Sequence, residues 1–308
     1  MTRRSRRYAQ GIGAVALSMV MVAGCAAEGS SDVPQADLAS PCAPEDSPSG
    51  VAPPAGNEQG WTLRFTDDFN RCDLGDDWST YNGQPGGNPN SRWDASMVTL
   101  DKGVLDLGAA RQPDGWVTGG VSNYPVTQQY GRWLVRMRAD PSADISYHML
   151  LWPQDESWPP EIDFAESVSG DRSEMSAFLH WVDVDGGNAK TNAETGGDFS
   201  QWHTVGVEWG PGIVRYLLDG QVWAQANSDT MVPDTPMWLA LQAEAGACER
   251  RLDWGMTPCT GVGELHPDEL SVEIDWVAVY GADMPVLEKM YERGEFDPGP
   301  ATIELTDS

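Results

Sequence analysis

The chain has 308 residues, with 47 Asp and Glu against 19 Lys and Arg, and a formal charge of −28 at pH 7. This charge argues against nucleic acid and polyanionic polysaccharides as ligands, because like charges repel. The 33 Gly and 22 Pro argue against a helical bundle, whereas 14 Trp and an apolar fraction of 40% argue against disorder. The length allows one large domain or two small ones, and the composition favours a turn-rich, mostly β protein.

The first 24 residues have the pattern of an export signal. A cluster of Arg residues precedes an apolar stretch, Gly11–Val22, that is too short to span a bilayer. The stretch ends in VAGC, which resembles the bacterial lipoprotein box and implies cleavage before Cys25 and lipidation of that cysteine. We therefore expect residues 1–24 to be a lipoprotein signal peptide and the exported protein to be anchored by lipid to the outer face of the bacterial cell membrane. A plain secretory signal with an incidental cysteine is the alternative, and Ser5-Arg6-Arg7 is a weak indication of twin-arginine export.

Residues 25–56 hold the expected lipidated cysteine and a segment rich in Pro, Ser and Ala, which predicts a linker without a core. Four cysteines follow Cys25, and an even number in an oxidising compartment predicts two disulfides. Among the three possible connectivities, Cys248–Cys259 would close one loop and Cys42–Cys72 would then join the linker to the domain. The chain has neither a CxxC pair nor an HExxH motif, which argues against a zinc site.

Residues 57–282 are expected to form one domain of short β-strands separated by Gly, Pro, Asp and Asn. Within it, Arg215–Leu218 and Gln221–Ala224 flank Asp219-Gly220, which predicts a hairpin with a two-residue turn. About a dozen strands without a long amphipathic helix predict an antiparallel β-sandwich. Residues 283–308 are expected to be a C-terminal tail with one short helix near Val286–Arg293. The other predicted strands include Met97–Leu100, Gly103–Leu107, Ile145–Trp152, Glu161–Val168, Met175–Val182, Met237–Ala243 and Ser271–Tyr280.

The segment WPPEIDFAE, residues 158–166, carries three acids in one predicted strand. Alternate side chains of a strand share a face, so Glu161 and Asp163 lie together while the apolar residues between them point to the core. Strict alternation would put Glu166 on the wrong face, and a bulge near Phe164-Ala165 would return it to the acidic face. Like charges in a row disfavour folding. An acidic strand face that only serves solubility is the alternative interpretation.

A pair of carboxylates in one cleft is what glycoside hydrolysis requires. One attacks the anomeric carbon or activates water, and the other protonates the leaving oxygen. A third acid between them raises the pKa of the residue that must begin protonated, and it can hydrogen-bond the nucleophile. Because sugar rings stack on aromatic faces, Trp152, Trp158 and Trp181 are candidate substrate-binding residues, with core packing as the alternative for each.

The sequence EIDFAE resembles the bulged ExDxxE signature of family 16 of the glycoside hydrolases, the β-glucanase and agarase group. Further segments resemble this family in the same order along the chain. They are FTDDF at 65–69, YGRW at 130–133 with Arg136, WHTVGVEW at 202–209 followed by Tyr216 and Asp219-Gly220, and EIDWVAVY at 273–280.

The resemblance implies an all-β jelly-roll sandwich with a substrate cleft on its concave face. It also implies a retaining double displacement in which Glu161 is the nucleophile, Glu166 the acid/base and Asp163 the assisting acid. Strand spacing alone leaves both the retaining and the inverting carboxyl separation open. We expect an endo-β-glycanase that hydrolyses internal bonds of a polysaccharide, with a neutral β-1,3- or mixed-linkage glucan as substrate. We expect it to be a monomer that needs no cofactor for catalysis.

Three further residues complete the candidate substrate-binding set, namely Arg136, His180 and Gln242. His180 lies on an expected inner strand, where it either lines the cleft or packs. A second Glu-Ile-Asp, Glu273–Asp275, lacks the third acid. The resemblance nevertheless makes Asp275 a candidate ligand for a structural calcium ion, which prefers hard oxygen ligands.

Two segments depart from the family pattern. The family's Asn-rich, Gly-Gly segment appears as LQAEAG at 241–246, and the Asn residues of the loop 82–93 do not align with the family's cleft-lining Asn. Both departures leave the sugar contacts open.

Two other functions need the same fold. A transglycosylase would need the same three acids, and a lectin-like binding module would have lost Glu161 or Glu166. The absence of a Gly-x-Ser-x-Gly motif argues against a serine hydrolase.

Overall fold

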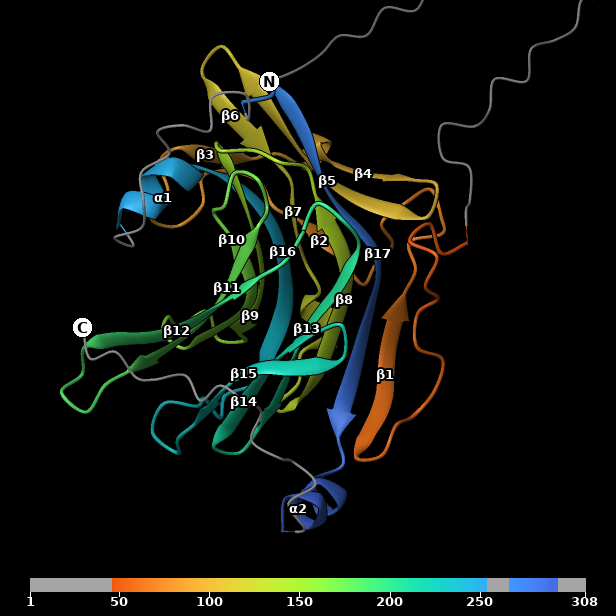
Figure 1. The fold of residues 1–308 in the computed structure, drawn as a ribbon, viewed down its shortest axis with the longest axis vertical. Helices are drawn as coiled ribbons and strands as arrows, with labels where there is room; N and C mark the ends of the chain where they lie inside the picture. The colour runs from red at the N-terminus through yellow and green to blue at the C-terminus, as the bar shows by residue number, and fades with distance from the viewer. Residues whose placement is uncertain (1–45, 254–265, 293–308) are drawn as a thin grey trace, which may run out of the picture. The chain divides into compact units, whose positions relative to one another are not determined.

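The structure is a computed structural model that describes residues 46–253 and 266–292. Within those residues the strands form two sheets, of seven and of ten strands, so the expected antiparallel β-sandwich is confirmed (Figure 1). The seven-stranded sheet has the order β12 (Asn188–Gly196), β11 (Glu174–Val182), β10 (Glu161–Ser167), β9 (Ile145–Pro153), β16 (Met237–Ala245), β7 (Gly120–Ser122) and β2 (Ser79–Thr80).

The ten-stranded sheet forms the second layer, and its pairing is mainly antiparallel, although β3 and β6 run parallel. Its main path is β15 (Gln221–Asn227), β14 (Ile213–Leu218), β13 (His203–Gly210), β8 (Gly131–Ala139), β17 (Glu269–Ala282), β5 (Val104–Gln112), β6 (Gly115–Thr118) and β3 (Ser91–Trp93). Off this path, β1 (Trp61–Asp67) pairs with β17 and β4 (Val98–Asp101) pairs with β5. The short helices are η1 (Ala95–Met97), η2 (Tyr124–Val126), α1 (Ala247–Asp253) and α2 (Met284–Glu292).

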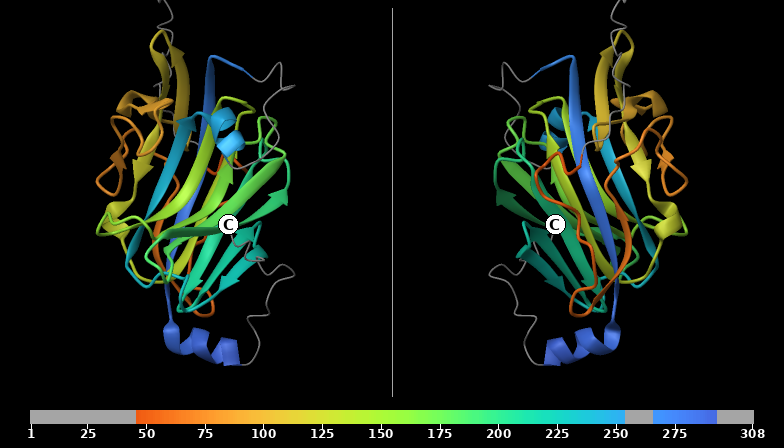
Figure 2. Two further views of the ribbon diagram at one scale, coloured as in Figure 1. Left: turned by 90° about the vertical axis from the view of Figure 1, so that its left-hand side faces the viewer. Right: turned by 90° about the vertical axis from the view of Figure 1, so that its right-hand side faces the viewer.

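The core lies between the two sheets, because alternate residues of each strand point inward. Trp133 and Val135 of β8 are buried, as are Met149 and Leu151 of β9, and all four belong to one hydrophobic cluster. Figure 2 shows the two layers from the sides. The other face of the seven-stranded sheet points away from this core, and we call it the acid-bearing face because it carries the three acids of β10.

The predicted hairpin is confirmed, since β14 and β15 pair across Asp219 and Gly220. Both turn residues have positive φ, 48° and 78°, which is the left-handed conformation that this tight turn requires. The predicted C-terminal helix is present as α2.

The end of the predicted linker is not separate from the domain. The backbone N–H of Ser49 donates to Asp275, and the indole of Trp276 donates to the carbonyl of Val51, so this segment packs on the ten-stranded sheet. The expected signal peptide, Cys25, Cys42 and Cys259 lie outside the described residues, and both disulfide pairings stay predictions. Among the residues that the structure describes, no helix combines the length and the apolar character needed to cross a membrane.

Candidate active site

The three acids of β10 share one face because the strand contains the predicted bulge. On the neighbouring strand β11, Asp163 pairs with Phe178 and Glu166 with Ser176, so three steps along β10 match two along β11. The register with β9 shifts at the same place. The extra residue lets Phe164 and Ala165 both enter the core, which returns Glu166 to the side of the other two acids. The bulge is therefore confirmed.

Glu161 and Asp163 lie in surroundings that favour their protonated forms. Burial raises the pKa of Glu161 well above its usual range, and the neighbouring Asp163 adds to the effect. Burial and the charge of Glu166 likewise raise the pKa of Asp163. The indole N–H of Trp158 donates to Glu161 Oε2 at 2.7 Å, which acts in the opposite direction by favouring the carboxylate.

Glu166 has the opposite electrostatics. Burial acts to raise its pKa, but His148 and Arg250 together outweigh burial, so that its pKa lies below the usual value. The Nδ1 atom of His148 lies 2.5 Å from Glu166 Oε1. In the free protein, therefore, Glu166 is the first of the three acids to ionise, whereas Glu161 and Asp163 retain their protons to higher pH.

His180 faces the acids from β11. It is in register with Glu161, and its Nε2 atom lies 3.4 Å from Asp163 Oδ2. Burial lowers its pKa, although Glu161 and Glu166 oppose that effect, so the ring is predominantly neutral at pH 7. The ligand atoms of Glu161, Asp163 and His180 lie within 4.8 Å of one another, and in the described part of the chain only this group has such spacing. Because the indole N–H of Trp158 already donates to Glu161 Oε2, we assign the group to acid–base chemistry.

Two of the candidate tryptophans lie at the acid-bearing face. Trp158 is 45% exposed, and its ring lies 5.6 Å from that of His180. Trp152 alternates with the core residue Leu151 and packs beside Trp238 of β16. Aromatic surface for sugar rings therefore flanks the acids.

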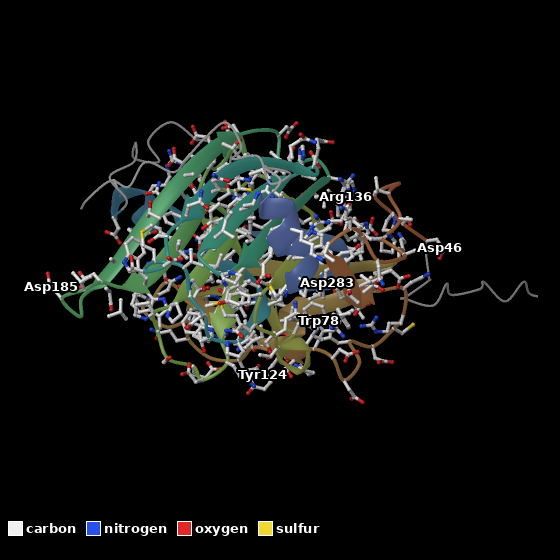
Figure 3. All side chains as sticks on the ribbon, turned by 90° about the horizontal axis from the view of Figure 1, so that it is seen from below. Asp46, Trp78, Tyr124, Arg136, Asp185 and Asp283 are labelled. Atoms are coloured by element: carbon white, nitrogen blue, oxygen red, sulfur yellow. The ribbon has the colours of Figure 1, made fainter. Side chains whose placement is uncertain are left out.

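Two candidate substrate-binding residues do not lie at this face. Trp181 follows the inward-pointing Leu179 by two residues, so it faces the same side and packs against the hydrophobic core, whereas His180 between them faces the acids. Arg136 lies on β8 of the other sheet, on the outer side, where its guanidinium contacts Ser49. Figure 3 shows Arg136 well away from the tip of the β11–β12 hairpin at Asp185. In contrast, Gln242 of β16 does lie on the acid-bearing face, in register with His148.

Asp275 lies on β17 of the ten-stranded sheet, whereas the three acids lie on β10 of the other sheet. It occupies a bulge of β17 between Ile274 and Trp276 and is fully buried. Its Oδ2 atom accepts the N–H of Ser49, whereas Oδ1 has no hydrogen-bond partner among the residues that the structure describes. An unpartnered carboxylate oxygen fits a hard cation. Burial raises the pKa of this carboxyl group, although the bonds from Ser49 and the charge of Arg136 act in the opposite direction.

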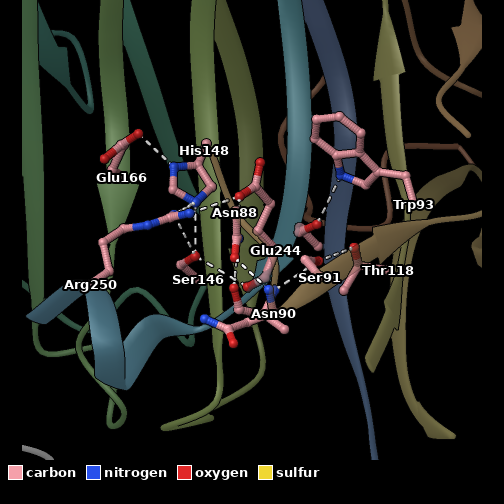
Figure 4. Close-up of polar contacts among 12 residues, drawn as sticks. Asn88, Asn90, Ser91, Trp93, Thr118, Ser146, His148, Glu166, Glu244 and Arg250 are labelled. Atoms are coloured by element: carbon pink, nitrogen blue, oxygen red, sulfur yellow. Dashed lines mark hydrogen bonds and ion pairs between the residues drawn. The ribbon is translucent and has the colours of Figure 1, made fainter. Parts of the chain in front are cut away.

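A polar network that the sequence did not predict lies beside Glu166 (Figure 4). Charged and polar side chains of β9 and β16 point to the acid-bearing face and meet Arg250 of α1. The signal was present in part, because polar residues interrupt the apolar pattern of both strands at alternate positions. The members of the network are Asn88, Ser146, His148, Glu244 and Arg250.

A separate cavity of about 610 Å³ lies between the β13–β14 end of the sandwich and α2. Its lining includes Trp61, Glu208, Asp229 and Met284, and it contains none of the three acids. This cavity is thus distinct from the candidate active site.

Comparison with known proteins gives matches over most of the described chain. Residues 87–278 match the family model described as glycosyl hydrolases family 16. The endo-1,3-1,4-beta-glycanase ExsH of Rhizobium meliloti is 26% identical over 210 residues, which are 64% of this chain and 42% of that protein. A second protein of that organism, the endo-1,3-1,4-beta-glycanase EglC, is 25% identical over 255 residues, 72% of this chain and 52% of that protein. The chain spans about half the length, or less, of these curated relatives.

Solved structures share the fold at low sequence identity. The laminarinase catalytic domain from Thermotoga maritima has a TM-score of 0.60 at 19% identity, covering 72% of this chain and 98% of that one. The endo-β-1,3-glucanase from Pyrococcus furiosus has a TM-score of 0.61 at 16% identity, covering 74% and 97%. A structure described under endo-acting O-glycanases of the human gut microbiota that initiate mucin breakdown has a TM-score of 0.64 at 19% identity, covering 77% and 97%. These likenesses place the fold among the jelly-roll β-sandwiches.

Proposed function

Because the chain belongs to glycosyl hydrolase family 16, as its sequence motifs predicted, we propose that it hydrolyses internal glycosidic bonds of a β-linked glucan. The observation that carries the proposal is the arrangement of Glu161, Asp163 and Glu166, which the bulge of β10 places on one face beside the exposed ring of Trp158. Two carboxyl groups on one face can supply both the nucleophile and the acid that glycoside hydrolysis needs.

The proposed reaction is a retaining double displacement. The carboxylate of Glu161 attacks the anomeric carbon while the carboxylic acid of Glu166 gives its proton to the leaving oxygen, so the glycosidic bond breaks and a glycosyl ester forms. In the second step the carboxylate of Glu166 takes a proton from water, whose oxygen attacks the anomeric carbon and releases Glu161. Asp163 lies between the two and assists by sharing a proton with Glu161.

The reactive form requires a proton on Glu166 and a carboxylate at Glu161, whereas the free protein favours the reverse. One proton must therefore be redistributed within the acid set, whose ionisations are interdependent. The hydrogen bond from Trp158 stabilises the ionised form of Glu161 and so supports this redistribution.

A neutral β-1,3- or mixed-linkage glucan is the proposed substrate. The names of the two Rhizobium meliloti relatives and the two laminarinase-type structures support it, as does the aromatic surface at Trp152 and Trp158. The formal charge of −28 disfavours a polyanionic chain.

The test is reducing-sugar release by the full chain from laminarin, mixed-linkage glucan, xyloglucan, agarose, carrageenan and mucin O-glycans. Glu161→Gln is the blank, because it removes the nucleophile without changing side-chain size. Release from a β-glucan that is absent in the variant would support the proposal. Equal release by the variant would refute the assigned nucleophile, and release only from mucin or galactan would refute the substrate. Product sizing would separate hydrolysis from transglycosylation.

We further propose that Cys25 carries a lipid anchor and that the domain is a monomer with disulfides Cys42–Cys72 and Cys248–Cys259. The lipoprotein-like sequence before Cys25 and the even number of the remaining cysteines support these proposals. Loss of the protein from the membrane fraction in Cys25→Ala would test the anchor. Non-reducing peptide mapping would test the disulfides, and sedimentation would test the monomer.

A structural calcium ion at Asp275 is also proposed, with Asp275 Oδ1 as the side-chain oxygen that it would use. Its contribution there would be structural, because Asp275 belongs to the sheet opposite the one that carries the three acids.

A further inference from the structure

A continuous chain of polar contacts ends on Glu166. His148 Nδ1 contacts Glu166 Oε1, and Arg250 Nη1 contacts the opposite ring nitrogen, His148 Nε2. Arg250 Nη2 then donates to Glu244 Oε2 at 2.7 Å, and Asn88 Nδ2 donates to the same oxygen at 2.8 Å. We call this series, Asn88–Glu244–Arg250–His148–Glu166, the relay, and Figure 4 shows it. It joins β16, α1, β9 and β10 to the segment before β3.

The contact with Arg250 selects one form of His148. A guanidinium can donate hydrogen bonds but cannot accept them, so His148 Nε2 must present its lone pair to Arg250. The ring proton must then be on Nδ1, and it points at Glu166 Oε1. Ser146 is compatible with this form, because its hydroxyl lies 2.8 Å from Nε2 and can donate to it or to the carbonyl of Glu244.

Arg250 is itself held in place. Its side chain is 20% exposed and that of Glu244 is 9% exposed, so their ion pair is shielded from water. Glu244 balances the guanidinium charge, and Asn88 bridges Glu244 to the carbonyl of Ala245. The guanidinium is therefore fixed relative to β9 and not free to leave His148.

We propose that His148 is a positioning residue for Glu166, and that Arg250, held by Glu244 and Asn88, locks His148 in the neutral Nδ1–H form. The lock guarantees Glu166 a donor at Oε1 and leaves Oε2 as the oxygen that exchanges a proton with the substrate. The role of Glu166 in catalysis rests on the proposed function, but the state of His148 does not.

The relay also sets the charges that Glu166 experiences. The titratable and charged groups that face it are Glu161 and Asp163 of its own strand, His180 of β11, His148 of β9 and Arg250 of α1. In the neutral form His148 acts on Glu166 through its Nδ1–H hydrogen bond and not through a charge. Arg250 lowers the pKa of both Glu166 and Asp163. Its removal should therefore move the pH profile of kcat/KM to higher pH, because a carboxylate that loses a nearby cation retains its proton longer.

The experiment compares the full chain with Arg250→Met, Arg250→Lys and Arg251→Met by NMR of ¹⁵N-labelled histidine and by pH-dependent kinetics. Methionine has neither charge nor donors, whereas lysine can only donate and should restore the lock. Arg251→Met is the matched control, because Arg251 lies on the same helix but donates to the carbonyl of Val168 and not to His148. The chain has only four histidines, so His148 can be assigned by the signals lost in His148→Asn.

We expect the wild type, Arg250→Lys and Arg251→Met to show a proton on His148 Nδ1 and none on Nε2. Arg250→Met should show a mixture of both neutral forms, a kcat reduced by about tenfold or more with little change in KM, and a profile moved to higher pH. A wild-type ring protonated on Nε2 would overturn the proposal. So would an Arg250→Met protein that loses activity while its histidine spectrum and pH profile stay unchanged.

Two safeguards keep the test decisive. Should Arg250→Met fail to fold by circular dichroism, the wild-type and Arg250→Lys spectra alone decide whether His148 carries its proton on Nδ1. Should the wild type cleave no glycan in the panel, the proposed function fails, whereas the NMR comparison still decides the lock.

Discussion

The indole N–H of Trp158 donates to Glu161 Oε2 at 2.7 Å, although the Trp158 side chain is 45% exposed. This bond favours the carboxylate of Glu161 and so opposes burial and Asp163, which raise the pKa of that group. The same exposed ring can stack on a sugar. Trp158 thus connects substrate binding to the ionisation of the proposed nucleophile, because one indole can offer its face to a sugar and donates its N–H to the carboxylate of Glu161.

Trp158→Phe should separate these two roles, because phenylalanine keeps an aromatic face and loses the N–H. A hydrogen bond to a charged group contributes about 1.5–3 kcal/mol, so we expect kcat/KM to fall by roughly tenfold or more. The pKa of Glu161 should rise further. Because activity is lost once both Glu161 and Glu166 are ionised, the basic limb of the pH profile should move to higher pH. Trp152→Phe is the control, because the indole of Trp152 donates to Glu156 and to none of the three acids. It should change KM and leave both limbs in place. If the limbs of the kcat/KM profile lie at the same pH in Trp158→Phe and in the wild type, Trp158 does not control the ionisation of Glu161.

Glu161→Gln should abolish turnover and yet make the folded protein more stable at neutral pH. The folded-state pKa of Glu161 is raised above its unfolded value, so the wild type binds more protons when folded. Its stability is therefore fully present below the unfolded pKa and is lost as the pH rises through the folded pKa. Glutamine cannot ionise and avoids this loss. We expect the Tm of the variant at pH 7 to exceed that of the wild type by a few degrees, since about 1 kcal/mol corresponds to roughly 2–4 °C. The difference should vanish near pH 4, and a Tm gain that is the same at both pH values would contradict the argument.

The arrangement of the three acids could be predicted from sequence because it depends on local geometry. Residue alternation along one strand places Glu161 and Asp163 together, and the position of Glu166 then demands one extra residue. The hairpin at Asp219-Gly220 is local in the same sense. The edge strand β12 was missed because its sequence, NAKTNAETG, is polar on both faces and has no apolar periodicity.

Contacts between distant segments could not be predicted in this way. Arg136 belongs to a family-like segment, but only the pairing of β8 with β13 and β17 shows that it lies on the outer side of the other sheet. Trp181 is the exception, because alternation along β11 already places it on the inner side, opposite to His180. Arg250 meets His148 because the chain after β16 bonds to the carbonyl of Asp144, just before β9, which brings α1 beside that strand. No local sequence pattern predicts this contact.

Trp181→Ala should therefore behave as a core substitution. The side chain packs against the main hydrophobic cluster, so its removal leaves a cavity and costs about 3 kcal/mol, the lower end for Trp→Ala because the ring is partly exposed. Chemical denaturation should show this loss, while KM for the glucan should stay near the wild-type value. Trp152→Ala is the comparison, with the larger effect expected on KM. A raised KM in Trp181→Ala at wild-type stability would show that Trp181 contacts substrate after all.

The buried carboxylate of Asp275 gives a test of the proposed calcium ion. If calcium binds its unpartnered Oδ1, adding calcium should raise the Tm of the wild type and chelation should lower it, because a ligand that binds only the folded state stabilises it. At a calcium concentration 100-fold above Kd the gain is about 2.7 kcal/mol. Asp275→Asn should lose this response, and Asp185→Asn, at an exposed hairpin tip, should keep it. A wild-type Tm that is equal in calcium and in chelator would refute the ion. Arg136 and the N–H of Ser49 would then be the groups that stabilise the charge of Asp275.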